Sequence, residues 1–209
     1  MLEIINPIKI AVLLTFLNAF CLRKKNKCDI ILVKILFISL IIEFTNSILI
    51  LFDIPFGRFM SLGIIMYYYY WLIILKKSIR NAYYTDFLTL MFVLFGIINF
   101  IFLESTNFNY YTFVLGTIIY ISIFIIESFH QLKKENLLFF QSNNYNLLFA
   151  PILLFLGMSF MFGFKSKILT SFIIIYNVKL YTLVIYFVNI IYYLLLNLYI
   201  YKERKLKNV

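Results

Sequence analysis

Charged residues are scarce in this sequence, because only 13% of its 209 residues are Asp, Glu, Lys or Arg. A soluble globular domain has about 25% charged residues and roughly half apolar residues. Here 64% of the residues are hydrophobic. A soluble fold of this size cannot bury so much apolar surface. The composition therefore excludes an ordinary soluble domain and predicts a protein whose expected partner is the lipid bilayer.

Histidine and cysteine are also scarce, with one histidine, His130, and two cysteines, Cys21 and Cys28. A zinc site needs about three or four such ligands. The His-Glu-x-x-His and Gly-x-Ser-x-Gly patterns of hydrolytic enzymes are absent from the sequence. Two cysteines beside a basic segment imply no disulfide framework. We therefore expect no catalytic residue, no metal ligand and no cofactor.

Acidic residues number nine against 19 Lys and Arg, which gives a net charge of +10. In a soluble protein this excess would suggest binding to nucleic acid. Here the basic residues lie in short runs between apolar segments, where they act as topology signals and contacts for anionic lipid headgroups. We therefore expect no direct nucleic-acid binding.

Long apolar runs are abundant, and a bilayer-spanning helix needs about 20 mainly apolar residues. The runs predict an all-α polytopic bundle of about seven transmembrane helices, in one transmembrane domain over residues 1–209 with no soluble domain. The predicted spans are residues 5–22, 30–52, 59–75, 87–103, 110–126, 146–164 and 180–200. Five or six spans are the alternative if the first or the sixth run does not insert.

Two apolar stretches outside these spans leave choices open. Residues 168–176 are too short to span, so they are expected either to lie flat at the interface or to extend the seventh span. Residues 137–140, Leu-Leu-Phe-Phe, are an alternative early start of the sixth span.

The basic residues alternate between the two sides of the membrane. Alternate connections carry 13 of them: Arg23, Lys24, Lys25, Lys27, Lys76, Lys77, Arg80, Lys133, Lys134, Lys202, Arg204, Lys205 and Lys207. The opposite connections carry Arg58, Lys165 and Lys167, with Lys9 and Lys179 at their edge. Because cytoplasmic loops are enriched in Lys and Arg, this asymmetry predicts an N-terminus outside and a C-terminus inside. The expected location is the bacterial cytoplasmic (inner) membrane.

One carboxylate lies deep in a predicted span. Glu43 follows the start of the second span by about 13 residues, or roughly 20 Å, and intramembrane charges are functional candidates. Other polar residues fall at a comparable depth. The candidate intramembrane polar cluster is Glu43, Asn46, Ser47, Tyr67, Asn99, Thr117 and Asn189. These groups either satisfy one another and fix helix packing, or they form a ligand-sensing or ion-relay site.

Three short features carry a resemblance to known proteins. They are Ile42-Glu43-Phe44, the tyrosine-rich third span that ends in Lys76-Lys77, and the closing helix from Asn189 to Lys205 with its basic tail. With these features the chain resembles small bacterial multi-span membrane proteins that serve as accessory or sensory partners. More loosely, it is similar to the membrane accessory proteins of type VI-B CRISPR loci, which accompany and modulate an RNA-guided ribonuclease. The resemblance implies a regulatory role without catalysis and assigns no site residue.

Two functions from different classes follow as expectations. The first is a non-enzymatic inner-membrane accessory or regulatory protein that acts with a protein partner or as a homo-oligomer, in a defence or sensory system. The alternative is a small transporter or channel, with a polar path around Glu43.

Overall fold

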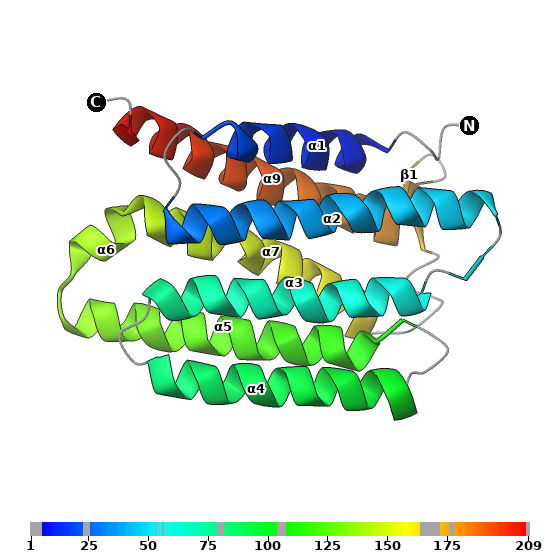
Figure 1. The fold of residues 1–209 in the computed structure, drawn as a ribbon, viewed down its shortest axis with the longest axis horizontal. Helices are drawn as coiled ribbons and strands as arrows, with labels where there is room; N and C mark the ends of the chain where they lie inside the picture. The colour runs from blue at the N-terminus through cyan, green and yellow to red at the C-terminus, as the bar shows by residue number, and fades with distance from the viewer. Residues whose placement is uncertain are drawn as a thin grey trace.

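Seven helices of 14 to 28 residues run side by side in the part of the chain that the structure describes (Figure 1). The structure is a computed structural model that describes residues 6–22, 26–52, 54–55, 57–78, 82–103, 108–163, 172–175 and 178–207. The long helices are α1 (Pro7–Phe20), α2 (Lys27–Leu51), α3 (Gly57–Ser78), α4 (Ala82–Ile98), α5 (Tyr110–Lys133), α7 (Asn143–Gly163) and α9 (Leu180–Lys207). The short elements are the π-helix η1 (Asn99–Leu103), α6 (Leu137–Gln141), β1 (Ile173–Ile175) and β2 (Val178–Lys179).

Five segments are long and apolar enough to cross a membrane, which makes the chain a helical membrane protein. They are Gly57–Ser78, Tyr84–Leu103, Tyr110–Lys133, Asn143–Phe162 and Leu180–Leu206. Of the other two long helices, α1 has 14 residues and is shorter than a typical span, whereas α2 has 25 residues and carries four charged side chains. A helical membrane bundle is therefore confirmed, and the count of seven spans stays a prediction.

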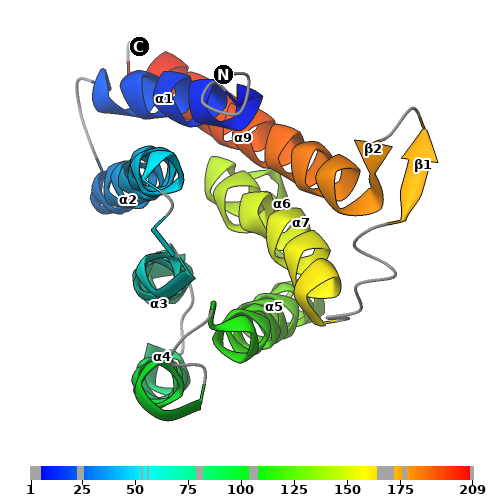
Figure 2. The same cartoon turned by 90° about the vertical axis from the view of Figure 1, so that its right-hand side faces the viewer.

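The helices form a ring when they are viewed along their axes (Figure 2). Helix α1 packs on α2, α2 on α3, α5 on α7, α7 on α9, and α9 again on α1. Helix α4 lies at the edge of the ring, where it packs against α3 and α5. Its outer face exposes Phe87, Leu90 and Leu94, as expected for side chains solvated by lipid.

Large aromatic side chains fill the centre of the ring. Trp71 and Tyr68 of α3, Tyr120 of α5, Phe155 of α7 and Tyr192 of α9 are all completely buried. Their rings meet mostly edge to face, with centroids 4.4 to 6.3 Å apart. Such edge-to-face pairs are favourable beyond the area that they bury. This cluster therefore fixes how α3, α5, α7 and α9 pack.

Local sequence signals explain where the first two helices begin. Asn6 accepts a hydrogen bond from the Ile8 amide at 3.1 Å, and Pro7 occupies the first turn of α1, where its missing N–H is not needed. At the start of α2 the Asn26 amide donates to Asp29 Oδ2 at 2.7 Å. An acidic residue three positions after the cap is the capping-box arrangement, which satisfies an amide that the helix leaves free.

Because the chain reverses at each connection, one end of the bundle collects the predicted basic segments (Figure 1). Helices α1, α3, α5 and α9 finish at this end, and α2, α4 and α7 begin there. We call it the basic end, and its described lysines and arginine are Lys27, Lys76, Lys77, Lys133, Lys134, Lys202, Arg204, Lys205 and Lys207. Arg23, Lys24, Lys25 and Arg80 lie outside the described residues.

Both stretches left open in the sequence resolve into short separate elements. Ile173 pairs with Lys179 in the antiparallel β1–β2 pair, and α9 begins only at Leu180, so an extension of the seventh span is wrong. Residues 164–171 and 176–177 lie outside the described residues. An early start of the sixth span is also wrong, because α6 stops before Ser142. The Ser142 hydroxyl instead accepts from the Tyr145 amide and caps α7.

The two cysteines give a test of orientation, because both lie at the basic end. Cys21 is exposed, while Cys28, just before the predicted second span, is partly buried. Burial raises the pKa of the Cys28 thiol. Maleimides react with thiolate, so near neutral pH we expect Cys21 to label rapidly and Cys28 slowly, with Cys28 accelerating as pH rises toward its raised pKa.

The measurement is the mass shift of the Cys21→Ser and Cys28→Ser variants treated with a membrane-impermeant maleimide. If the basic end is cytoplasmic, Cys21 in the Cys28→Ser variant is expected to label rapidly in inverted vesicles and not in spheroplasts. Rapid labelling of Cys21 in spheroplasts would place the basic end outside.

Candidate functional site

The seven residues of the predicted polar cluster occupy separate places in the bundle rather than one site. Each of them hydrogen-bonds or packs within its own neighbourhood, and these neighbourhoods belong to different helix pairs. The structure brings Glu43 and Ser47 together, whereas hydrogen bonds tie Tyr67, Thr117 and Asn99 to other helices. No observation assigns any of these residues a function.

Glu43 and Ser47 of α2 form a group with Lys9 of α1, which lies far from the basic end. The Lys9 ammonium donates to Ser47 Oγ at 2.6 Å, and it lies close enough to Glu43 to interact with its charge. Ser47 Oγ in turn donates to the Glu43 backbone carbonyl at 2.9 Å. A basic and an acidic side chain within a bundle gain by pairing with each other. Lys9 thus completes this group, although the sequence indicated it only as the edge of a span.

Asn46 and Asn189 do not join that group through any hydrogen bond of the described residues. Asn46 is buried, and its Oδ1 has no hydrogen-bond partner within the described part of the chain. Asn189 donates to the Ile185 carbonyl of its own helix at 2.8 Å. A back-bonded amide of this kind satisfies itself and makes no link between helices.

Tyr67 belongs to the aromatic centre. Its hydroxyl donates to the Tyr192 hydroxyl at 2.7 Å, which joins α3 to α9. Its ring lies edge to face against Trp71 and Phe155. Tyr67 therefore contributes a hydrogen bond between helices to the packing of the interior.

Thr117 lies beside the aromatic centre, where α3, α5 and α7 meet. Its hydroxyl bonds to the Tyr68 hydroxyl at 2.6 Å and to Ser159 Oγ at 2.5 Å. Thr117 and Ser159 also lie at the floor of an open groove of about 500 Å³ between α5 and α7. The rim of this groove is formed by exposed apolar side chains, Ile118, Leu156 and Phe160.

Asn99 begins the π-helix η1 that ends α4, at the end of the bundle opposite the basic end. Its Nδ2 donates to Thr112 Oγ1 of α5 at 2.8 Å. One turn earlier, a Cβ on Gly96 would lie 3.0 Å from Ile65 of α3 and 3.3 Å from Thr112. Glycine therefore lets α4 approach both neighbours closely enough for the Asn99 bond.

A second polar network lies at the basic end, and sequence reasoning missed it. Asp29 is completely buried and accepts a hydrogen bond from the Tyr199 hydroxyl at 2.7 Å. The buried Glu203 accepts from Asn143 Nδ2 at 2.9 Å and from Asn26 Nδ2 at 3.5 Å. These bonds join the first turns of α2 and α7 to the last turns of α9. We call this set the basic-end network.

The capping box of α2 was the available signal for part of this network. The spacing of Asn26 and Asp29 indicates a helix start, but one oxygen of Asp29 also reaches Tyr199, 170 residues away in the chain. In the sequence Glu203 lies among Lys202, Arg204 and Lys205, a pattern typical of a solvated tail. The burial of Glu203 comes from the packing of α9 against α7, which no local pattern predicts.

Among the residues that the structure describes, no group of three or more His, Cys, Asp or Glu side chains could hold a metal ion. Comparisons with protein-family models, with curated proteins and with solved structures found no match to this chain.

Proposed function

We propose that the chain is a non-enzymatic accessory or regulatory protein of the bacterial cytoplasmic membrane, which acts by binding a protein partner. The observation that supports this proposal is the aromatic centre of the ring. A conducting protein needs a water-filled path through its interior. Here the interior holds four completely buried aromatic side chains, Trp71, Tyr68, Tyr120 and Tyr192. Water enters a cavity only where several polar groups line it. A filled interior of this kind suits a protein that works through its surfaces.

The hydrogen bonds of the interior support the same proposal. Tyr67–Tyr192 joins α3 to α9, and Thr117 joins α5 to α3 and α7. The Tyr67–Tyr192 bond crosses the ring from α3 to α9, and the bonds of Thr117 link neighbouring helices. Bonds between helices are how polar side chains stabilise membrane bundles. These residues then hold a rigid scaffold, and the parts left for recognition are the lipid-facing helix surfaces and the basic end. In this proposal the basic end faces the cytoplasm, and the partner belongs to a defence or sensory system.

One observation favours the alternative, a small transporter or channel. Lys9, Glu43 and Ser47 place a cation, a carboxylate and a hydroxyl together within the bundle. In a transporter, such a group would bind an ion or relay a proton between α1 and α2. The alternative therefore makes a definite prediction about Glu43.

A flux measurement separates the two functions. For the full chain in liposomes that hold a pH-sensitive dye, we expect proton and potassium flux no greater than in empty liposomes, because the aromatic centre leaves no wet path. The Glu43→Gln variant is expected to behave in the same way. Flux through the unmodified chain that Glu43→Gln abolishes would overturn the accessory function and establish the transporter.

A second measurement tests the partner directly. The tagged chain is expressed with the product of each neighbouring gene, and we expect one of these products to copurify at a fixed stoichiometry. The Lys133→Glu, Lys134→Glu double variant should weaken that complex about tenfold, because complementary charge steers association. The matched control is Arg58→Glu with Lys179→Glu at the other end, which should leave the complex intact. Copurification of no product, or equal loss in both variants, would contradict a partner at the basic end.

A further inference from the structure

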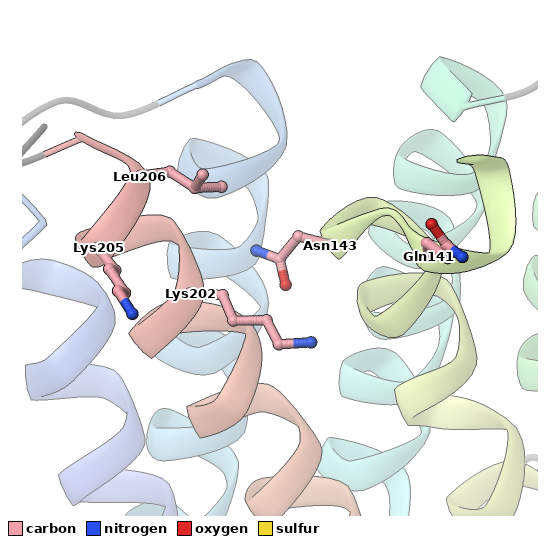
Figure 3. A pocket seen from close by; sticks show the side chains of 5 residues that line it. All are labelled: Gln141, Asn143, Lys202, Lys205 and Leu206. Carbon is pink, nitrogen blue, oxygen red and sulfur yellow. The ribbon is translucent and has the colours of Figure 1, made fainter.

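A pocket of about 520 Å³ opens at the basic end, between the last turns of α9 and the start of α7 (Figure 3). Lys202, Lys205 and Leu206 line one side of it, and Asn143 and Gln141 line the other. Figure 3 shows Asn143 between the α9 residues and Gln141. The pocket therefore joins residues of α6, α7 and α9 that lie just outside the predicted spans.

The lining of the pocket is positively charged. Lys202 and Lys205 are three residues apart on α9, so they share one face of the helix. Asn143 is the first residue of α7, where the helix dipole favours an anion. The nearby carboxylate of Glu203 is already engaged, because it accepts from Asn143 and from Asn26. The two lysines are thus the charges that a ligand in this pocket would meet.

The side chain of Asn143 is fixed before any ligand arrives. Its Nδ2 donates both to Glu203 and to the Tyr199 carbonyl, at 2.9 and 3.1 Å. Its Oδ1 is buried and has no hydrogen-bond partner among the described residues. The basic-end network therefore holds one wall of the pocket in place.

Apolar side chains adjoin this charged pocket. Leu206 lines it and is 67% exposed, and Leu137 and Leu138 of the short helix α6 are 66% and 77% exposed. Exposed leucines beside lysines suit the boundary between headgroups and acyl chains, where both are solvated favourably. A site for a small water-soluble anion would gain nothing from this apolar rim.

We propose that this pocket binds the headgroup of an anionic glycerophospholipid. The phosphodiester lies between Lys202 and Lys205, and the acyl chains run past Leu206 and α6 into the bilayer. Phosphatidylglycerol has such a headgroup, whose net charge is negative. The site goes beyond the proposed function, because it holds whether or not the chain has a protein partner.

The test is a binding titration of the purified full chain with phosphatidylglycerol or phosphatidylcholine in detergent, followed by native mass spectrometry. We expect bound phosphatidylglycerol and little bound phosphatidylcholine. The Lys202→Gln, Lys205→Gln double variant should bind phosphatidylglycerol about 30-fold more weakly, since each lysine near an anionic headgroup contributes about fivefold. The matched control, Lys133→Gln with Lys134→Gln, removes the same charge from the same end outside the pocket and should weaken binding less than fivefold.

Each other outcome overturns the proposal. Equal weakening in both variants would mean diffuse attraction to the basic end rather than a site. Competition by millimolar inorganic phosphate or glycerol phosphate would identify a water-soluble phosphate as the ligand. Equal binding of the two lipids by the unmodified chain would show that the pocket does not recognise the negative charge of the headgroup. Because all four lysines are at helix ends and exposed, a melting temperature equal to that of the unmodified chain verifies that each variant is folded.

Discussion

Replacement of Trp71 by alanine is expected to lower the free energy of unfolding by about 3–5 kcal/mol, the cost of deleting a large buried aromatic side chain. Trp71 is completely buried, and its ring lies edge to face against Tyr67, Tyr120 and Tyr192. Tyr67 is on α3, as is Trp71, whereas Tyr120 and Tyr192 come from α5 and α9, so one truncation weakens contacts with two other helices. In a bilayer the penalty is mainly lost packing, because lipid solvates apolar side chains as well as the protein interior does.

The measurement is an SDS titration in mixed micelles, followed by circular dichroism. Trp71→Phe keeps an aromatic ring at the centre and should lose less than half as much stability as Trp71→Ala. The control is Phe87→Ala on the outer face of α4, where the ring is 57% exposed to lipid and its removal should change stability by less than about 1 kcal/mol. A loss for Phe87→Ala equal to that for Trp71→Ala would show that the aromatic centre has no special role.

Replacement of Asp29 by alanine is expected to cost about 2–4 kcal/mol, because it removes two hydrogen bonds to one buried carboxylate. One is the helix-capping bond from the Asn26 amide, and the other comes from the Tyr199 hydroxyl. In the variant the Tyr199 hydroxyl remains buried without that acceptor. The same SDS titration measures this loss.

A double-mutant cycle with Tyr199→Phe separates the two bonds of Asp29. If the carboxylate and the hydroxyl stabilise each other, Asp29→Ala and Tyr199→Phe together should cost about 1–2 kcal/mol less than the sum of the single variants. Asp29→Asn, which keeps one acceptor oxygen, should lie between Asp29→Ala and the unmodified chain. Strict additivity of the two single variants would contradict the coupling and reduce Asp29 to a helix cap.

The positions of the long helices were predictable because they depend on local composition. The predicted span 110–126 lies within α5, and the span 180–200 begins at the first residue of α9. The helices continue past the apolar runs at the basic end, as α9 does through Lys202 and Glu203. Hydropathy marks the part of a helix that lipid solvates, so it does not detect turns that continue outside the bilayer.

The contacts among polar residues were not predictable, because they depend on how the helices rotate and which helices are neighbours. Equal depth placed Glu43 and Thr117 in one cluster, but α3 lies between α2 and α5 (Figure 2). The depth of a residue gives its position along the membrane normal only. Its position in the membrane plane depends on the rotation and the neighbours of its helix. Lys9 and Ser47 meet because α1 packs on α2, which only the fold reveals.

The pairing of α1 with α9 also sets an order of events during synthesis. Thr15 accepts from Asn197 Nδ2 at 2.7 Å, across 182 residues of chain. At a ribosomal rate of about 5–20 residues per second, roughly 10–40 s separate the emergence of these two side chains. During that interval the 14-residue α1 can pack on α2, but Asn197, the partner of the Thr15 hydroxyl, has not yet been synthesised. The ring can therefore close only after α9 has been synthesised.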